Sequence, residues 1–163
     1  MQEDEIMDVI CDIGDRNNVR ILYACESGSR AYGFESPDSD YDVRFVYIRP
    51  VSEYLSLHQP HDVIEARPTD ELDVVGWDIR KFLTLMRKSN PSAFEWLGSP
   101  IVYHVESSFD DAIRPVEWRC FSPYTSAHHY AGIATSAMRM VEHGDRRPKK
   151  LLYALRGILG AQW

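Results

Sequence analysis

Two carboxylates at the start of an apolar run constrain this chain more than any other feature. Asp40 and Asp42 introduce the run Val43–Ile48, which is rich in β-branched residues and reads as a buried strand. Residues two apart in a strand point to the same face, so both carboxylates would enter one space. Like charges that close repel unless a cation lies between them, and oxygen-rich sites suit Mg²⁺. The pattern predicts a metal site on a sheet.

A Gly28-Ser29 pair lies between this strand and an earlier apolar run at Val19–Cys25. Glycine lets a backbone approach a ligand closely, and a serine hydroxyl can donate to a phosphate oxygen. The alternative for Gly28 is an ordinary loop glycine. A phosphate-binding turn beside a carboxylate pair favours metal-assisted chemistry on a nucleoside triphosphate.

Residues 28–47 read GSRAYGFESPDSDYDVRFVY. This stretch resembles the signature of the DNA polymerase β-like nucleotidyltransferases, which is Gly-Ser, a spacer (ten residues here) and Asp-x-Asp on a strand. The resemblance narrows with GWDIRKF at 76–82, KSNPSAFEWLGSPIVY at 88–103 and KKLLYALR at 149–156. These segments are similar to the YcgL and RNA-ligase-associated (RlaP) group of predicted nucleotidyltransferases.

The resemblance implies an α/β (α+β) fold in which a small mixed sheet, flanked by helices, carries the carboxylates. The implied activity is Mg²⁺-dependent transfer of a nucleoside monophosphate from an NTP, ATP among them, to a hydroxyl of an unidentified acceptor. RNA is the acceptor that the family association suggests. Asp40 and Asp42 would hold two Mg²⁺ ions, or Mn²⁺ in their place. Two alternatives stay open: a non-catalytic nucleotide-binding or regulatory module, and a toxin–antitoxin-type nucleotidyltransferase acting on protein or tRNA.

A site of this type needs a third carboxylate on a neighbouring strand, and the sequence offers two candidates. Asp73 lies inside the predicted strand at Leu72–Trp77, and Asp78 follows its end. Asp78 also suits the N-cap of a helix that begins at Ile79, which would give it a sufficient structural role. We therefore favour Asp73 as a metal ligand and catalytic residue and keep Asp78 as the alternative.

The resemblance implies that Gly28 and Ser29 contact the nucleotide, and charge and helical spacing add Arg30, Lys150, Tyr153 and Arg156 as candidate nucleotide contacts. Arg30 could equally pair with Glu35. Lys149, Tyr153 and Arg156 share one helical face at spacings of four and three residues, with Lys150 beside Tyr153. This basic and aromatic face either grips a triphosphate or base, or is an ordinary solvated surface.

Charge is distributed unevenly along the 163 residues. Residues 1–78 carry 18 acidic and 6 basic side chains (−12), whereas residues 79–163 carry 7 acidic and 12 basic ones (+5). Solvated faces explain such an asymmetry, and so does a cleft in which a basic wall opposes a carboxylate site and suits a metal-bound polyphosphate.

Periodicity predicts strands in the first half and helices in the second, with a catalytic core at 1–103 and a helical segment at 104–163. Because the chain stops at Trp163 directly after an apolar helical pattern, we expect that segment to be truncated at its C-terminus. The chain lacks the uninterrupted apolar run of about 18 residues that a membrane span needs. Three widely spaced cysteines and an acidic N-terminus favour a cytoplasmic protein.

Overall fold

The computed structural model describes residues 2–143 and 148–162, with the backbone alone at 148–150, 153 and 162. The strands are β1 (Arg20–Glu26), β2 (Tyr41–Ile48), β3 (Val63–Thr69), β4 (Leu72–Asp78) and β5 (Val102–Val105). The helices are α1 (Glu3–Arg16), α2 (Gly28–Ala31), α3 (Val51–Tyr54), α4 (Ile79–Arg87), α5 (Pro91–Leu97), α6 (Ser107–Cys120), α7 (Pro123–Glu142) and α8 (Pro148–Gln162).

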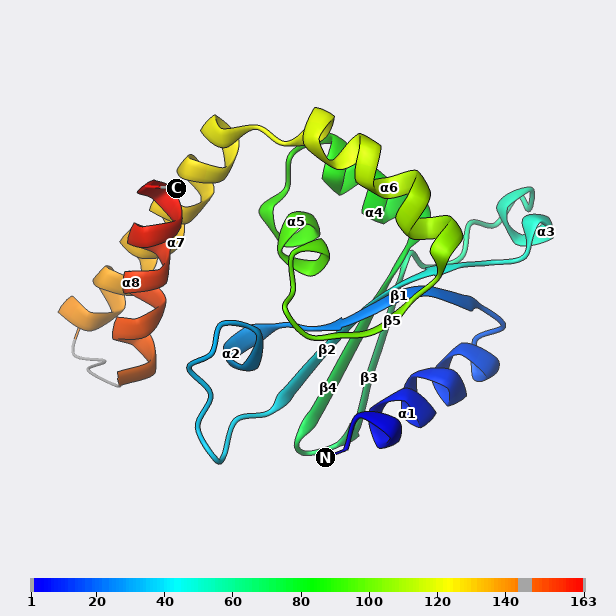
Figure 1. Ribbon diagram of the computed structural model, residues 1–163, viewed down its shortest axis with the longest axis horizontal. Coiled ribbons are helices and arrows are strands. Elements are labelled where there is room, and N and C mark those ends of the chain that lie inside the picture. The colour runs from blue at the N-terminus through cyan, green and yellow to red at the C-terminus, as the bar shows by residue number, and fades with distance from the viewer. Residues whose placement is uncertain (1, 144–147, 163) are drawn as a thin grey trace.

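The strands form one mixed sheet in the order β3-β4-β2-β1-β5 (Figure 1). Strands β2 and β4 run parallel, and the other three neighbouring pairs are antiparallel. The parallel pairing sets residues 41–47 of β2 opposite residues 72–78 of β4 without a bulge. The expected mixed sheet flanked by helices is confirmed.

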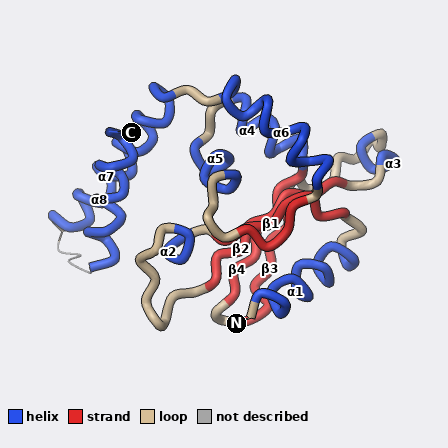
Figure 2. Tube along the Cα trace, in the orientation of Figure 1, coloured by secondary structure: helices blue, strands red, loops and turns tan. Residues whose placement is uncertain are grey.

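The two faces of the sheet are buried under different helices. Helix α1 presents Ile6, Ile10 and Ile13 to one face, where they pack with Val43, Phe45 and other apolar residues of β2 and β4. Helices α4, α5 and α6 cover the opposite face (Figures 1 and 2). Because side chains alternate along a strand, the residues of β2 are divided between two cores.

Helices α7 and α8 pack side by side as a pair that lies away from the sheet (Figure 2). In α7, the hydroxyl of Tyr130 donates to Glu95 of α5 at 2.8 Å. In α8, Arg156 contacts the same carboxylate. The helix pair is thereby connected to the helices that cover the sheet. Among the described helices, none has the length and apolar character needed to cross a membrane.

Between residues 102 and 120 the structure has a strand that was not predicted, β5, and a helix, α6, that was predicted only as part of the helical segment at 104–163. Strand β5 pairs with β1 at the edge of the sheet, and the predicted boundary after residue 103 falls inside it. Helix α6 contains Pro115, a residue that usually interrupts a helix. It nevertheless inserts Phe109 and Ile113 into the core beside α4. The sheet and its covering helices therefore continue to Cys120.

Gly76 gives a direct test of the β2–β4 packing. It lies opposite Phe45 in the register, and a Cβ at Gly76 would approach the Phe45 ring to 2.1 Å. Because Phe45 is fully buried and cannot move away, G76A should lower the free energy of unfolding by about 1–3 kcal/mol. The control is G132A in α7, where a Cβ would meet nothing within 4 Å. Because alanine has a higher helix propensity than glycine, G132A should stabilise the protein slightly. Equal unfolding midpoints in urea for G76A and the wild type would contradict this packing.

Candidate functional site

The parallel register places Asp42 of β2 directly opposite Asp73 of β4. A single nitrogen of Arg44, Nη2, lies 3.0 Å from Asp42 Oδ1 and 2.8 Å from Asp73 Oδ2. All three side chains belong to the sheet face that α4, α5 and α6 cover, since they alternate with residues packed under α1. Two predicted carboxylates are thus neighbours, with a cation between them.

The Gly28-Ser29 turn lies against Asp42. Gly28 has a φ of +61°, which favours glycine, and a Cβ there would lie 1.9 Å from Asp42 Oδ2. The preceding amide, that of Ser27, donates to the Asp42 carbonyl at 2.8 Å. Ser29 is buried in the first turn of α2. Only a residue without a side chain lets this turn approach the carboxylate so closely.

Asp40 lies in the exposed loop just before β2, and Arg30 holds that loop in place. The Arg30 guanidinium donates to the carbonyls of Ser39 (2.9 Å) and Asp40 (3.3 Å) and stacks over the Tyr41 ring at 3.8 Å. The described ion pairs include none between Arg30 and Glu35. As placed, Arg30 positions the loop that carries Asp40.

Glu26 supports the site from the opposite face of the sheet. It is 1% exposed, and its carboxylate accepts the Asp42 amide at 2.8 Å and the Tyr103 hydroxyl at 2.6 Å. Burial raises the pKa of Glu26 above its usual value, and these two hydrogen bonds oppose the rise. The sequence analysis assigned Glu26 no role in the site. Its position at the end of a buried strand, two residues before Gly28, was the feature of the sequence that indicated a role in the site.

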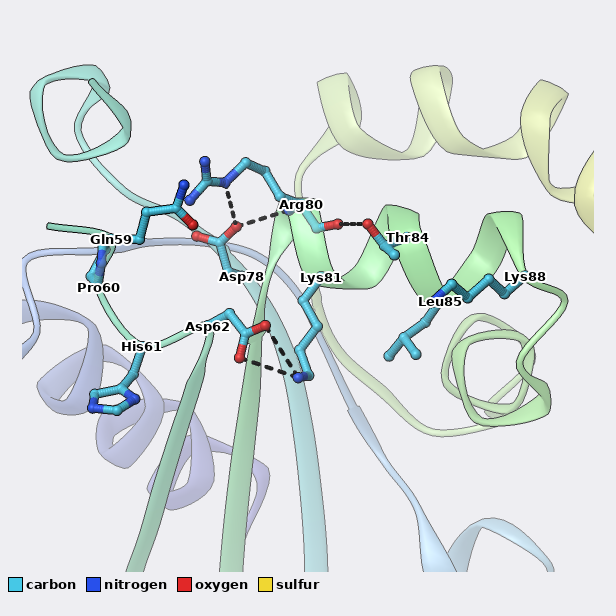
Figure 3. Close-up of a pocket in the computed structure, with 10 residues that line it drawn as sticks. All are labelled: Gln59, Pro60, His61, Asp62, Asp78, Arg80, Lys81, Thr84, Leu85 and Lys88. Carbon is cyan, nitrogen blue, oxygen red and sulfur yellow. Dashed lines mark hydrogen bonds and ion pairs between the residues drawn. The ribbon is translucent and has the colours of Figure 1, made fainter. Parts of the chain in front are cut away.

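Asp78 occupies the other end of β4 and has structural partners. Its carboxylate accepts the Arg80 amide of α4 and the Tyr54 hydroxyl, each at 2.8 Å. It is 2% exposed and lies five residues from Asp73, or about 17 Å along an extended strand. Asp78 lines a cavity of about 630 Å³. This cavity lies between the loop at 59–62 and α4 (Figure 3). The geometry therefore brings Asp73, and not Asp78, to Asp42.

The predicted basic face of α8 is described in part. The side chains of Lys150 and Tyr153 lie outside the described residues. Arg156 pairs with Glu95 and the Tyr32 hydroxyl, and its guanidinium lies 3.9 Å from the centre of the Tyr32 ring. Because Tyr32 directly follows α2, Arg156 connects α8 to the Gly-Ser turn. In this arrangement its charge is neutralised by Glu95 rather than directed at the carboxylates.

The donor set fits a divalent ion that is shared with substrate. No three His, Cys, Asp or Glu side chains in the described part of the chain lie close enough to hold a metal by themselves. Mg²⁺ in phosphoryl-transfer sites is bound through one or two carboxylates together with substrate phosphates and water. Asp42 and Asp73 could supply that pair, and Asp40 lies in the loop directly before β2.

Comparison with known proteins is consistent with this geometry. A profile of the family described as the RNA repair pathway DNA polymerase beta family, RlaP, matches residues 2–163. The chain belongs to this family. It is also 43% identical over 159 residues to the uncharacterized protein YcgL of Bacillus subtilis (strain 168). That match covers 97% of this chain and 61% of YcgL, so the chain spans about six tenths of the relative's length.

Asp73 and Asp78 should respond differently to substitution. D73N should weaken Mn²⁺ binding, measured by calorimetry, and leave the melting temperature almost unchanged, because Asp73 is half-exposed. D78A should keep Mn²⁺ binding and lower stability by about 1–3 kcal/mol, since it removes a helix cap and a buried acceptor. The opposite pair of results would assign the metal to Asp78.

Glu26 should make stability depend on pH. Its pKa is raised in the folded protein, so its contribution is present below the ordinary value of 4.5 and is lost as pH rises through the folded pKa. In E26Q the melting temperature should fall less than in the wild type when pH increases from about 4 to 8. E65Q, which changes an exposed carboxylate on β3, is the control. Parallel melting curves for E26Q and the wild type would contradict this.

Proposed function

We propose that this protein transfers a nucleoside monophosphate from an NTP to a hydroxyl group of an acceptor, with the help of Mg²⁺. The observation that carries the proposal is the juxtaposition of Asp42 and Asp73 on parallel strands beside the Gly28 turn. Membership in a polymerase beta family supports the same chemistry. Mg²⁺, when bound, would neutralise the phosphates and the leaving pyrophosphate during an in-line displacement.

The protein's own residues would position the reactants. Asp40 and Asp42 would hold the cation-bound triphosphate, and the Ser29 hydroxyl would donate to a phosphate oxygen. Arg30 would fix the loop that carries Asp40. In the reaction, the acceptor oxygen bonds to the α-phosphorus, the bond to pyrophosphate breaks, and the hydroxyl loses its proton. Asp73, the more exposed carboxylate of the pair, would accept that proton.

RNA is the acceptor that we propose to test first. The family description names an RNA repair pathway, and a terminal ribose presents the hydroxyl that the reaction needs. Residues 79–163 carry a net positive charge, which would favour the binding of a polyanion such as RNA beside the acidic residues of the first half of the chain. The chain spans about six tenths of YcgL. The acceptor is therefore proposed for this chain and is not transferred from the longer relative.

The assay follows label from each α-³²P NTP into RNA with free terminal hydroxyls. D40N and D42N should each reduce transfer about 100-fold or more, since metal ligation of the reacting phosphates is worth several kcal/mol. D38N is the matched control, because Asp38 is an exposed residue of the same loop. Transfer at the wild-type rate by both D40N and D42N would reject the assignment. Binding of NTP without transfer to RNA, protein or tRNA would favour a non-catalytic module.

A further inference from the structure

We propose that Arg44 acts as the resident cation of the Asp42–Asp73 pair and that a divalent ion must displace it to bind. The inference rests on the proposed function, because it concerns the same metal site. It makes Arg44 a positioning residue that holds the two carboxylates together and offsets one of their two negative charges until metal and nucleotide arrive.

The contacts of Arg44 are those of a bridging cation. Its Nη2 lies within 3.0 Å of one oxygen from each carboxylate, and its Nη1 donates to the carbonyls of Val43 (3.0 Å) and Asp73 (3.2 Å). The side chain is 17% exposed, so these bonds are largely shielded from water. Charge-assisted bonds of this kind are the strong ones. The guanidinium is therefore firmly held between two strands.

Arg44 and a bridging metal compete for the same oxygens. Asp42 Oδ1 and Asp73 Oδ2 both point at Arg44 Nη2, and Asp42 Oδ2 lies against the Gly28 turn. An ion bound between these two facing oxygens would take the place that Arg44 Nη2 occupies. A divalent ion a few ångströms from a guanidinium also meets strong repulsion. Metal binding between these two oxygens would therefore require Arg44 to leave the position that it holds.

A purely structural role for Arg44 predicts the opposite change in metal affinity. If Arg44 only braces the site, its removal lets Asp42 and Asp73 move apart, and metal affinity falls. If Arg44 competes with the metal, its removal leaves two mutually repelling carboxylates that gain from a divalent ion. The sign of the change in affinity therefore separates the two roles without any measurement of catalysis.

The experiment is calorimetric titration of the whole chain with Mn²⁺, without nucleotide, for wild type, R44Q and R49Q. Arg49 is a matched control, because it is similarly buried and pairs with Glu53 at 3.0 Å outside the site. We expect R44Q to bind Mn²⁺ about ten-fold more tightly than wild type, the equivalent of one lost charge-assisted contact. R44Q should melt at a lower temperature without metal and gain more from Mn²⁺ than wild type does. R49Q should keep the wild-type Mn²⁺ affinity.

A second variant keeps the test decisive if R44Q does not fold. R44K retains the charge but lacks the planar fork, so its Mn²⁺ affinity should be between those of wild type and R44Q, and above wild type in any case. Equal or weaker Mn²⁺ binding by the folded Arg44 variants would overturn the inference and leave the proposed function intact, provided D42N abolishes binding. No Mn²⁺ binding by wild type or any variant without nucleotide would overturn the inference, while the proposed function would still be tested separately by the label-transfer assay.

Discussion

The parallel pairing of β2 with β4 is the contact on which the site depends. In this register Asp42 and Asp73 lie opposite each other on adjacent strands, and such strands are about 4.8 Å apart. Two like charges placed directly opposite each other repel and destabilise the sheet. Arg44, two residues along β2 and on the same face, pairs with both carboxylates and offsets one of their two negative charges. The alternate residues of the two strands, including Val43 and Phe45, are buried under α1 and fix the register, since a slip of one residue would invert every side chain.

The second constraint on the site comes from outside the sheet. Glu26 holds the Asp42 amide from the opposite face, and Arg156 reaches from α8 to Tyr32 at the end of α2. The Gly-Ser turn is thus held between the sheet and the helix pair. Glu95 of α5 receives both Arg156 and Tyr130, so three helices meet at one carboxylate. This arrangement would connect the position of α7 and α8 to the geometry of the turn.

Much of the fold could be predicted from local patterns. The strands predicted at Val43–Ile48 and Leu72–Trp77 and the helix predicted to begin at Ile79 follow from apolar runs and an N-cap residue, and the structure has these bounds within two residues. Strand β5 was missed, because a four-residue edge strand gives little pattern. Helix α6 was predicted only as part of the helical segment at 104–163, because Pro115 obscures its bounds.

The site could be predicted less completely, because its geometry depends on long-range pairing. Periodicity identified Asp42, but the parallel register that brings Asp73 to it is a property of the assembled sheet. The same holds for Arg44, which in sequence is only a charged residue between apolar neighbours. The engagement of Arg156 by Glu95 was missed because it joins residues 61 positions apart. Spacing along one helix could not reveal it.

Anomalous X-ray diffraction from crystals grown with Mn²⁺ and a non-hydrolysable NTP analogue would test the central claim most directly. The account predicts an anomalous peak at coordination distance, about 2 Å, from carboxylate oxygens of Asp42 and Asp73, with Arg44 moved out of the position it holds between them. A peak beside Asp78 in the cavity of Figure 3, with Arg44 still bridging the two aspartates, would contradict it.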